Sequence, residues 1–195
     1  CPDITGRVVE SLSRRGLAEH DAVRRGVAYL LQSQERNGSW YGRWGVNYIY
    51  GSFLAMRGLA AAQGPDTREA IDKAARWLHA TQNSDGGWGE SCASYGRDRF
   101  VPAASCPSQT AWAVLGLLAA GDRDSSHVRL GIQFLLERQR ADGTWPEEAT
   151  TGTGFPNVFY LTYGMYRDYF PMLALASTWQ SLAYGRASDR SRARQ

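Results

Sequence analysis

The stretch QERNGSW, residues 34–40, decides the fold because its pattern returns twice further along the chain. The second copy is QNSDGGW at residues 82–88, and the third is QRADGTW at residues 139–145. Each copy has Gln first, Asn or Asp three positions later, then Gly, and Trp six positions after the Gln. The copies lie 48 and 57 residues apart, and repeats on this scale are typical of stacked supersecondary units.

An amphipathic helix is expected before each copy. Apolar residues recur there at intervals of three and four, as on one face of a helix. These residues are Val27, Leu30 and Leu31, followed by Gln34; Ile71, Ala74, Ala75, Trp77 and Leu78; and Leu130, Ile132, Phe134, Leu135 and Leu136. The Asn-Gly or Asp-Gly pair stops each helix, since Gly accepts the left-handed conformation beyond a helix end.

A second kind of helix is predicted between the copies, at residues 48–62, 108–120 and 165–184. These segments are rich in Ala, Gly and Leu and carry few charges. A helix that is apolar nearly all round is buried. The alternation therefore predicts two concentric layers, in an all-α toroid or an arc of one. No strands are expected.

The last segment, residues 186–195, is predicted to be a disordered basic tail. It contains four arginines, Arg186, Arg190, Arg192 and Arg194, and one acidic residue, Asp189. Contact with an anionic membrane surface is the alternative interpretation.

Composition bears on the partners and the compartment that the protein can be expected to have. A net charge of +3 gives no argument for a nucleic-acid partner. The three cysteines have no Cys-x-x-Cys spacing, so a disulfide framework is not expected and a reducing compartment is. No apolar run is long enough for a membrane-spanning helix, which needs about 18 residues. The chain opens with Cys1 rather than Met, which suggests a segment of a longer protein.

The repeated Gln and Trp side chains are predicted to be structural. The Gln amide can bond free groups at a helix end, and the Trp can lie across it, so that one outer helix is tied to the next. The six residues are Gln34, Trp40, Gln82, Trp88, Gln139 and Trp145.

The repeated element resembles the QW motif of triterpene cyclases. SWYGRWGVNYIYG at residues 39–51 is similar to that family's WFGRWGVNYLYG stretch, and GWGESCASY at 87–95 and SQTAWA at 108–113 also resemble family segments. GTGFPNVFYLTYGMYR at residues 152–167 resembles squalene-hopene cyclases more than oxidosqualene cyclases. The resemblance spans residues 3–176. It implies that residues 1–185 are the C-terminal part of an all-α (α/α) toroid, or barrel, catalytic domain and form roughly half of that barrel.

Cyclisation of a polyene requires an acid that protonates an alkene and a dry cavity that stabilises the moving carbocation. Aromatic faces suit such a cavity, since a cation–π contact contributes about 0.5 kcal/mol when exposed and about 2 kcal/mol when desolvated. By spacing alone, Phe155, Phe159, Tyr163 and Tyr166 would form a core stripe if that stretch were helical. The resemblance implies instead that these four residues line the cavity and stabilise cations. It implies the same role for Trp44 and Tyr50, and Gly154 is expected to let the backbone approach the substrate.

The initiating acid of the family is the central Asp of a D-x-D-D motif, which this sequence lacks. The nearest match, Asp122-Arg123-Asp124-Ser125, fails at its last position. The acid is therefore expected upstream of this segment. Asp3 and Arg7 match the family's D-V-T-x-[His/Arg] stretch, whose basic residue bonds near the acid; an N-cap role for Asp3 and a surface role for Arg7 are the alternatives. Arg stands here where some hopene cyclases have His, and because Arg stays charged this difference argues against a proton-relay role for Arg7.

The resemblance implies a segment of a class II triterpene cyclase that converts squalene, or a similar polyprenyl chain, to a hopene-like product. This segment alone is expected to be inactive. No cofactor or metal is implied, since the three histidines are isolated and no nucleotide-binding motif occurs. Expected partners are the linear isoprenoid substrate, the N-terminal remainder of the protein and the cytoplasmic side of a membrane, bound peripherally, with a homodimer left open. The alternative is a non-catalytic helical-repeat module that binds hydrophobic molecules.

Overall fold

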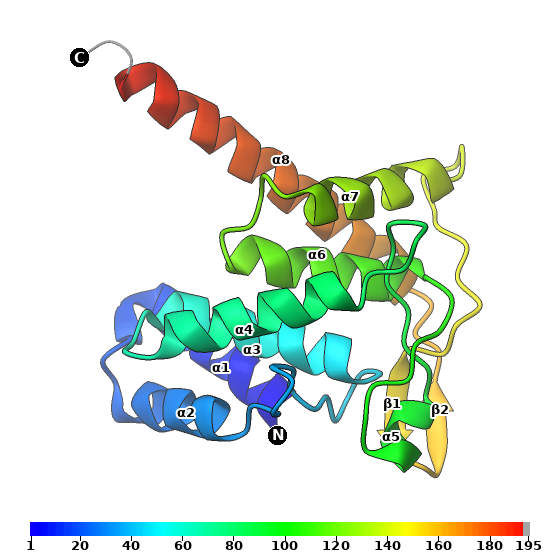
Figure 1. Ribbon diagram of the computed structural model, residues 1–195, viewed down its shortest axis with the longest axis horizontal. Helices are drawn as coiled ribbons and strands as arrows, with labels where there is room; N and C mark the ends of the chain where they lie inside the picture. Colours follow the sequence, from blue (N-terminus) through cyan, green and yellow to red (C-terminus); the bar gives the residue numbers. More distant parts are fainter. Residues whose placement is uncertain (193–195) are drawn as a thin grey trace.

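A computed structural model describes the backbone of residues 1–192 and the side chains as far as residue 183. Eight α-helices, one π-helical turn and one short hairpin make up the described part (Figure 1). The elements are α1 (Pro2–Leu12), the turn η1 (Ser13–Leu17), α2 (Asp21–Gln32), α3 (Tyr48–Ala62), α4 (Thr67–Ala80), α5 (Ala93–Arg97), α6 (Pro107–Ala119), α7 (Ser126–Arg138), β1 (Gly152–Phe155), β2 (Phe159–Leu161) and α8 (Tyr166–Arg192).

The long helices form two layers. The inner helices pack side by side in the order α1, α3, α6, α8. The outer helices pack against this row: α2 on α1 and α3, α4 on α3 and α6, and α7 on α6 and α8 (Figure 1). This alternation confirms the predicted partial (α/α) toroid.

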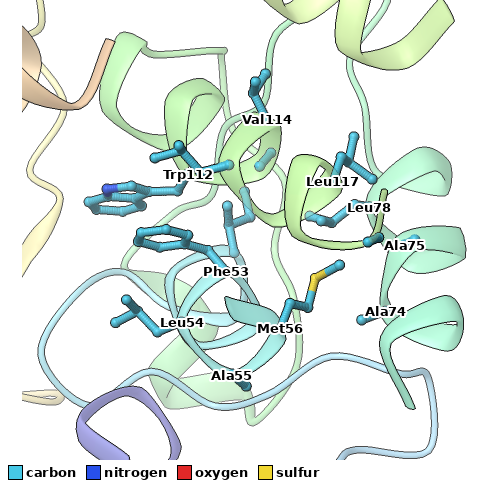
Figure 2. Packing of buried hydrophobic residues seen from close by; sticks show 14 of the residues in the cluster. Phe53, Leu54, Ala55, Met56, Ala74, Ala75, Leu78, Trp112, Val114 and Leu117 are labelled. Carbon is cyan, nitrogen blue, oxygen red and sulfur yellow. The ribbon is translucent and has the colours of Figure 1, made fainter. Parts of the chain in front are cut away.

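Burial distinguishes the layers as the composition of the helices predicts. Almost every residue of α3 and α6 is buried, whereas α2 and α4 each bury one face. The core contains large side chains, with Met56 of α3 near Leu78 of α4 and Leu117 of α6, and Phe53 of α3 near Trp112 of α6 (Figure 2). The layer of outer helices is therefore held by contact with an apolar inner row.

The prediction of no strands is wrong at residues 152–161. There β1 and β2 pair antiparallel, with Gly152 opposite Leu161 and Thr153 opposite Tyr160. The two strands meet in a turn where the Val158 N–H donates to the Phe155 carbonyl at 3.0 Å and Asn157 has a φ of 64°. Pro at the second position and Asn with positive φ at the third define a type II turn, a signal that the aromatic spacing concealed. The helical aromatic stripe is therefore wrong as well, since only Tyr166 lies in a helix.

Helix α8 begins one residue after the predicted inner helix and runs further. It continues through residues 186–192 of the segment expected to be a disordered tail, and residues 193–195 lie outside the described part. In Figure 1 the C-terminal part of α8 extends away from the other helices. Within the described residues, no helix combines the length and hydropathy needed to cross a bilayer.

Candidate functional site

Each copy of the repeat closes a turn with the same hydrogen bonds. The Gln side-chain amide donates to the Gly carbonyl four residues on, at 2.8 Å in the first and second copies and 3.0 Å in the third. Gln34 also donates to the Ala70 carbonyl of α4 at 2.8 Å, and Gln82 to the His127 carbonyl of α7 at 3.0 Å. Each of these two amides thus joins one outer helix to the next, whereas that of Gln139 bonds its own turn.

The three tryptophans of the repeat face inward. Their indole N–H groups donate to the carbonyls of Leu30, Leu78 and Leu135, ten residues earlier, at 2.7–2.8 Å. Their backbone N–H groups donate to a side chain of the following inner helix. The pairs are Trp40 with Ser52 at 2.9 Å, Trp88 with Thr110 at 3.0 Å and Trp145 with Asp168 at 3.2 Å. Every Trp of the repeat therefore links an outer helix end to the inner layer.

Two carboxylates that the sequence analysis missed, the first buried and the second partly buried, extend this frame. Glu90 lies two residues after the second repeat Trp and accepts the N–H groups of Asn47, Tyr48 and Ile49 at 3.0–3.1 Å, where α3 begins. Glu147 has the same position after the third Trp and accepts the N–H and hydroxyl of Ser108 where α6 begins. A negative charge is favourable at a helix N-terminus. Burial raises the pKa of both Glu90 and Glu147, although their hydrogen bonds oppose the shift. The signal was the recurrence of Glu two residues after Trp.

Asp3 holds the loop that carries Trp44. Its side chain is fully buried, and one carboxylate oxygen accepts the N–H groups of Arg43 and Trp44, each at 2.8 Å. Its other oxygen accepts the N–H of Ile4 at 2.9 Å. The N-cap of α1 is Cys1, so the alternative N-cap role for Asp3 is wrong.

Arg7 is exposed and reaches the inner layer through Tyr50. Its guanidinium donates to the Tyr50 hydroxyl at 3.0 Å, and its carbon lies 5.9 Å from the ring centroid. Burial alone would lower the pKa of the guanidinium, but Tyr50 together with Tyr166 and Tyr169 outweighs burial and raises that pKa. Arg7 therefore remains a fixed positive charge beside a buried phenol.

One group of predicted site residues gathers around Arg43. The Arg43 guanidinium lies 4.4 Å from the ring centroid of Trp44 and 5.5 Å from that of Phe155. Phe159 meets Phe155 edge to face at 5.5 Å. These three rings are 44%, 58% and 45% exposed for Trp44, Phe155 and Phe159, so much of their surface is open.

The other predicted aromatic residues form a second group over the inner helices. Tyr50 lies 4.8 Å from Trp112, which lies 6.0 Å from Tyr166, and Tyr166 lies 4.6 Å from Tyr163. Phe170 of α8 contacts both Trp112 and Phe53. Phe53 and Trp112 are seen at the contact between α3 and α6 in Figure 2. Trp112, Phe53 and Phe170 were not predicted as site residues, because their contacts join three inner helices that the sequence does not place together.

The two groups lie on connected backbone. The loop after Trp40 forms an isolated bridge between Gly45 and Gly152 of β1, and Gly45 packs directly on the Tyr50 ring. At Gly154 a Cβ would lie 1.9 Å from the Phe159 ring, so this glycine makes room for an aromatic side chain of the hairpin itself. The Phe159 ring therefore occupies the space beside Gly154 where the substrate was expected to approach the backbone.

A groove of about 480 Å³ opens between α1, α3 and α8 next to the second group. Its lining includes Arg7, Phe53, Tyr169 and Phe170, together with the ion pair of Glu10 and Arg57, which are 2.6 Å apart. Trp44, Phe155 and Phe159 do not line this groove. Among the described residues, no three His, Cys, Asp or Glu side chains gather as metal ligands would.

Two layers of helices with an aromatic face on the inner row define a protein of the terpene cyclase fold. The ent-copalyl diphosphate synthase of Streptomyces platensis superposes on 91% of the chain and 33% of its own length, with a TM-score of 0.67 and 21% identity, which establishes the fold alone.

The chain belongs to the squalene-hopene cyclase family, whose C-terminal domain matches residues 1–180. It is 48% identical over 177 residues to the squalene–hopene cyclase of Zymomonas mobilis, covering 89% of the chain and 27% of that protein. It is 41% identical over 199 residues to the dammaradiene synthase of Dryopteris crassirhizoma, covering 89% of the chain and 29% of that protein. The chain thus spans less than a third of these relatives.

Proposed function

We propose that this chain is the C-terminal part of a class II triterpene cyclase that converts squalene, or a similar linear polyprenyl chain, to a hopene-like product. The observation that carries the proposal is the pair of aromatic groups, one from a loop and a hairpin and one from three inner helices, which lie on connected backbone in a member of the squalene-hopene cyclase family. We propose that these two groups form one wall of the reaction cavity.

The chemistry of the wall follows from its side chains. Protonation of a terminal alkene starts a series of ring closures in which positive charge moves along the chain until a proton is lost or water adds. Aromatic rings stabilise each cation, and holding the chain folded converts ring closure to an oriented intramolecular step. Burial raises the pKa of Tyr166 to about 12, so this phenol stays protonated at neutral pH and does not act as a phenolate base. The same cause raises the pKa of Tyr50.

The acid that starts the reaction lies, in this proposal, on another part of the protein. The printed sequence has no D-x-D-D motif. Asp3 is committed to the backbone of Arg43 and Trp44, which suits a residue that positions the wall rather than a proton donor. Arg7 stays charged and cannot relay a proton, so we propose that it acts electrostatically, through its contact with Tyr50.

We further propose that the intact protein binds peripherally to the cytoplasmic side of a membrane, where a water-insoluble substrate accumulates. The apolar side chains of Met172, Leu173 and Trp179, exposed on α8, support an apolar partner for this region. No cofactor is required by the chemistry. Co-sedimentation of the intact protein with anionic lipid vesicles tests the membrane contact, and its mass in detergent tests for a homodimer.

The decisive experiment incubates the full-length protein with squalene and analyses the extracted lipids by mass spectrometry. A cyclic product is expected, separated from squalene by its retention and either isomeric with it, if a proton is lost, or heavier by one water, if water adds; residues 1–195 alone should give none. Binding of squalene without conversion would instead favour a non-catalytic hydrophobe-binding module. Recovery of only linear chains, from squalene and from shorter polyprenyl substrates alike, would overturn the enzymatic proposal.

A further inference from the structure

The short helix α5 places one buried hydroxyl between the two segments that carry the exposed aromatic rings. Tyr95 is 3% exposed, and its hydroxyl oxygen lies 2.7 Å from the Gly42 carbonyl and 2.8 Å from the Gly45 carbonyl. The same oxygen lies 2.8 Å from the side-chain oxygen of Thr153 in β1. Three hydrogen-bonding partners from two distant segments thus converge on one atom.

The hydrogen-bond inventory of a phenol fixes the direction of these bonds. A phenol carries one proton, and carbonyls only accept, so the Tyr95 proton is shared between the Gly42 and Gly45 carbonyls. Thr153 must then donate its own hydroxyl proton to the phenol oxygen. Burial raises the pKa of Tyr95 well above its usual range, so the hydroxyl keeps its proton.

The ring of Tyr95 is held as firmly as its hydroxyl. Tyr41 meets it edge to face at 5.7 Å, and Tyr160 of β2 stacks on it at 5.8 Å. Because both neighbours belong to the segments that the hydroxyl joins, the ring and the hydroxyl act on the same pair of segments.

These contacts lie beside the first aromatic group. Gly42 and Gly45 flank Arg43 and Trp44, and Thr153 precedes Phe155 by two residues. Two backbone bonds join the same segments: Val46 N–H to the Thr151 carbonyl at 2.9 Å and Thr153 N–H to the Trp44 carbonyl at 3.4 Å. The second bond is long, which leaves the Tyr95 hydroxyl as the shorter link next to Trp44.

We propose that Tyr95 is a positioning residue that sets the separation between the Trp44 loop and the hairpin bearing Phe155 and Phe159, and so sets which cation the wall stabilises. It does not touch the substrate. This inference rests on the proposed function, because the rings it positions are those of the proposed cavity wall.

The test is Tyr95→Phe in the full-length protein, which removes one oxygen and keeps the ring. Turnover should fall at least about tenfold, since a displacement of about 1 Å can cost about 10²-fold, and the share of incompletely cyclised products should rise. KM should change little, because no substrate contact is removed. Tyr48→Phe is the matched control: Tyr48 is also buried, and its hydroxyl makes no hydrogen bond to the described part of the chain.

Thr153 supplies an independent variant should Tyr95→Phe fold poorly. Thr153→Val removes the hydroxyl at constant shape and should shift the products in the same direction, whereas Thr153→Ser should restore the native profile. The two removals act on one hydrogen-bond centre, so the effects of the Tyr95→Phe and Thr153→Val double variant should be less than additive. A native product profile in folded Tyr95→Phe and Thr153→Val proteins would overturn the inference.

Amide hydrogen exchange separates this inference from the proposed function. In Tyr95→Phe, the amides of residues 43–46 and 152–155 should exchange faster than in Tyr48→Phe, whether or not the protein cyclises squalene. Faster exchange with no cyclic product from the native protein would reject the function and keep the link between the segments. Unchanged exchange would reject the positioning role itself.

Discussion

The tryptophans of the repeat and the aromatic rings of the loops are used in opposite ways. Trp40, Trp88 and Trp145 are fully buried, and each indole N–H finds a helix carbonyl. Trp44 and Phe159 are nearly half exposed and are placed through backbone bonds made by Asp3 and the hairpin. The comparison teaches that rings which complete the fold are satisfied within their own repeat. The rings proposed for the cavity wall are held through the backbone that carries them, and their faces are left open.

The largest expected effect comes from removing one of the buried tryptophans of the repeat. Trp88→Ala removes a fully buried ring and its bond to Leu78, and should lower the free energy of unfolding of the full-length protein by about 3–5 kcal/mol. Urea denaturation followed by circular dichroism measures the change. Trp179→Ala is the control, since that ring is 75% exposed and its removal should change stability by less than about 0.5 kcal/mol. Equal losses in the two variants would contradict the structural role of Trp88.

Removing one of the exposed rings should change the cyclisation products rather than the stability of the protein. Phe159→Ala in the full-length protein should raise prematurely terminated products roughly thirtyfold if one desolvated cation–π contact of about 2 kcal/mol is lost. Product analysis of squalene incubations measures this ratio. Val158→Ala, at the exposed tip of the same hairpin, should leave it unchanged. A native ratio in Phe159→Ala would remove Phe159 from the proposed wall.

The glutamines of the repeat differ in how many contacts they make, and their contributions to stability should differ accordingly. Gln82 bonds both its own turn and α7, whereas Gln139 bonds only its own turn. Gln82→Ala should therefore cost about 1–3 kcal/mol, because it removes the bonds to the carbonyl and the ring of partly buried His127 as well as the bond within its turn, and Gln139→Ala should cost less than about 1 kcal/mol. Paired urea denaturation curves measure both. The reverse order would show that the contact between outer helices adds nothing.

The sequence predicted correctly those parts of the fold that depend on residues close together in the chain. Helix α3 has the predicted bounds because its apolar composition and its ends are properties of adjacent residues. The hairpin was missed because the spacing of Phe155, Phe159 and Tyr163 imitates a helix, although Pro156 and Asn157 signal a turn. Of the candidate site, the residue types were predictable, but their grouping was not. The bonds of Asp3 to the Trp44 loop and of Tyr95 to Gly42 join residues more than 40 positions apart, for which no spacing rule exists.

The smallest expected effect concerns the turn that sets the hairpin apart from the helices. Asn157 has a φ of 64°, which Asn tolerates and which costs most other residues about 1–2 kcal/mol. Asn157→Ala should therefore loosen the turn and speed exchange of the Val158 amide, which bonds the Phe155 carbonyl at 3.0 Å. Asn157→Gly accepts the same φ without strain and should keep that amide as protected as in the native protein. Because the turn joins Phe155 to Phe159, only Asn157→Ala should shift the cyclisation products, and by less than Phe159→Ala does. An equal shift in the Gly and Ala variants would mean that the Asn157 side chain, and not the turn conformation, holds the two rings.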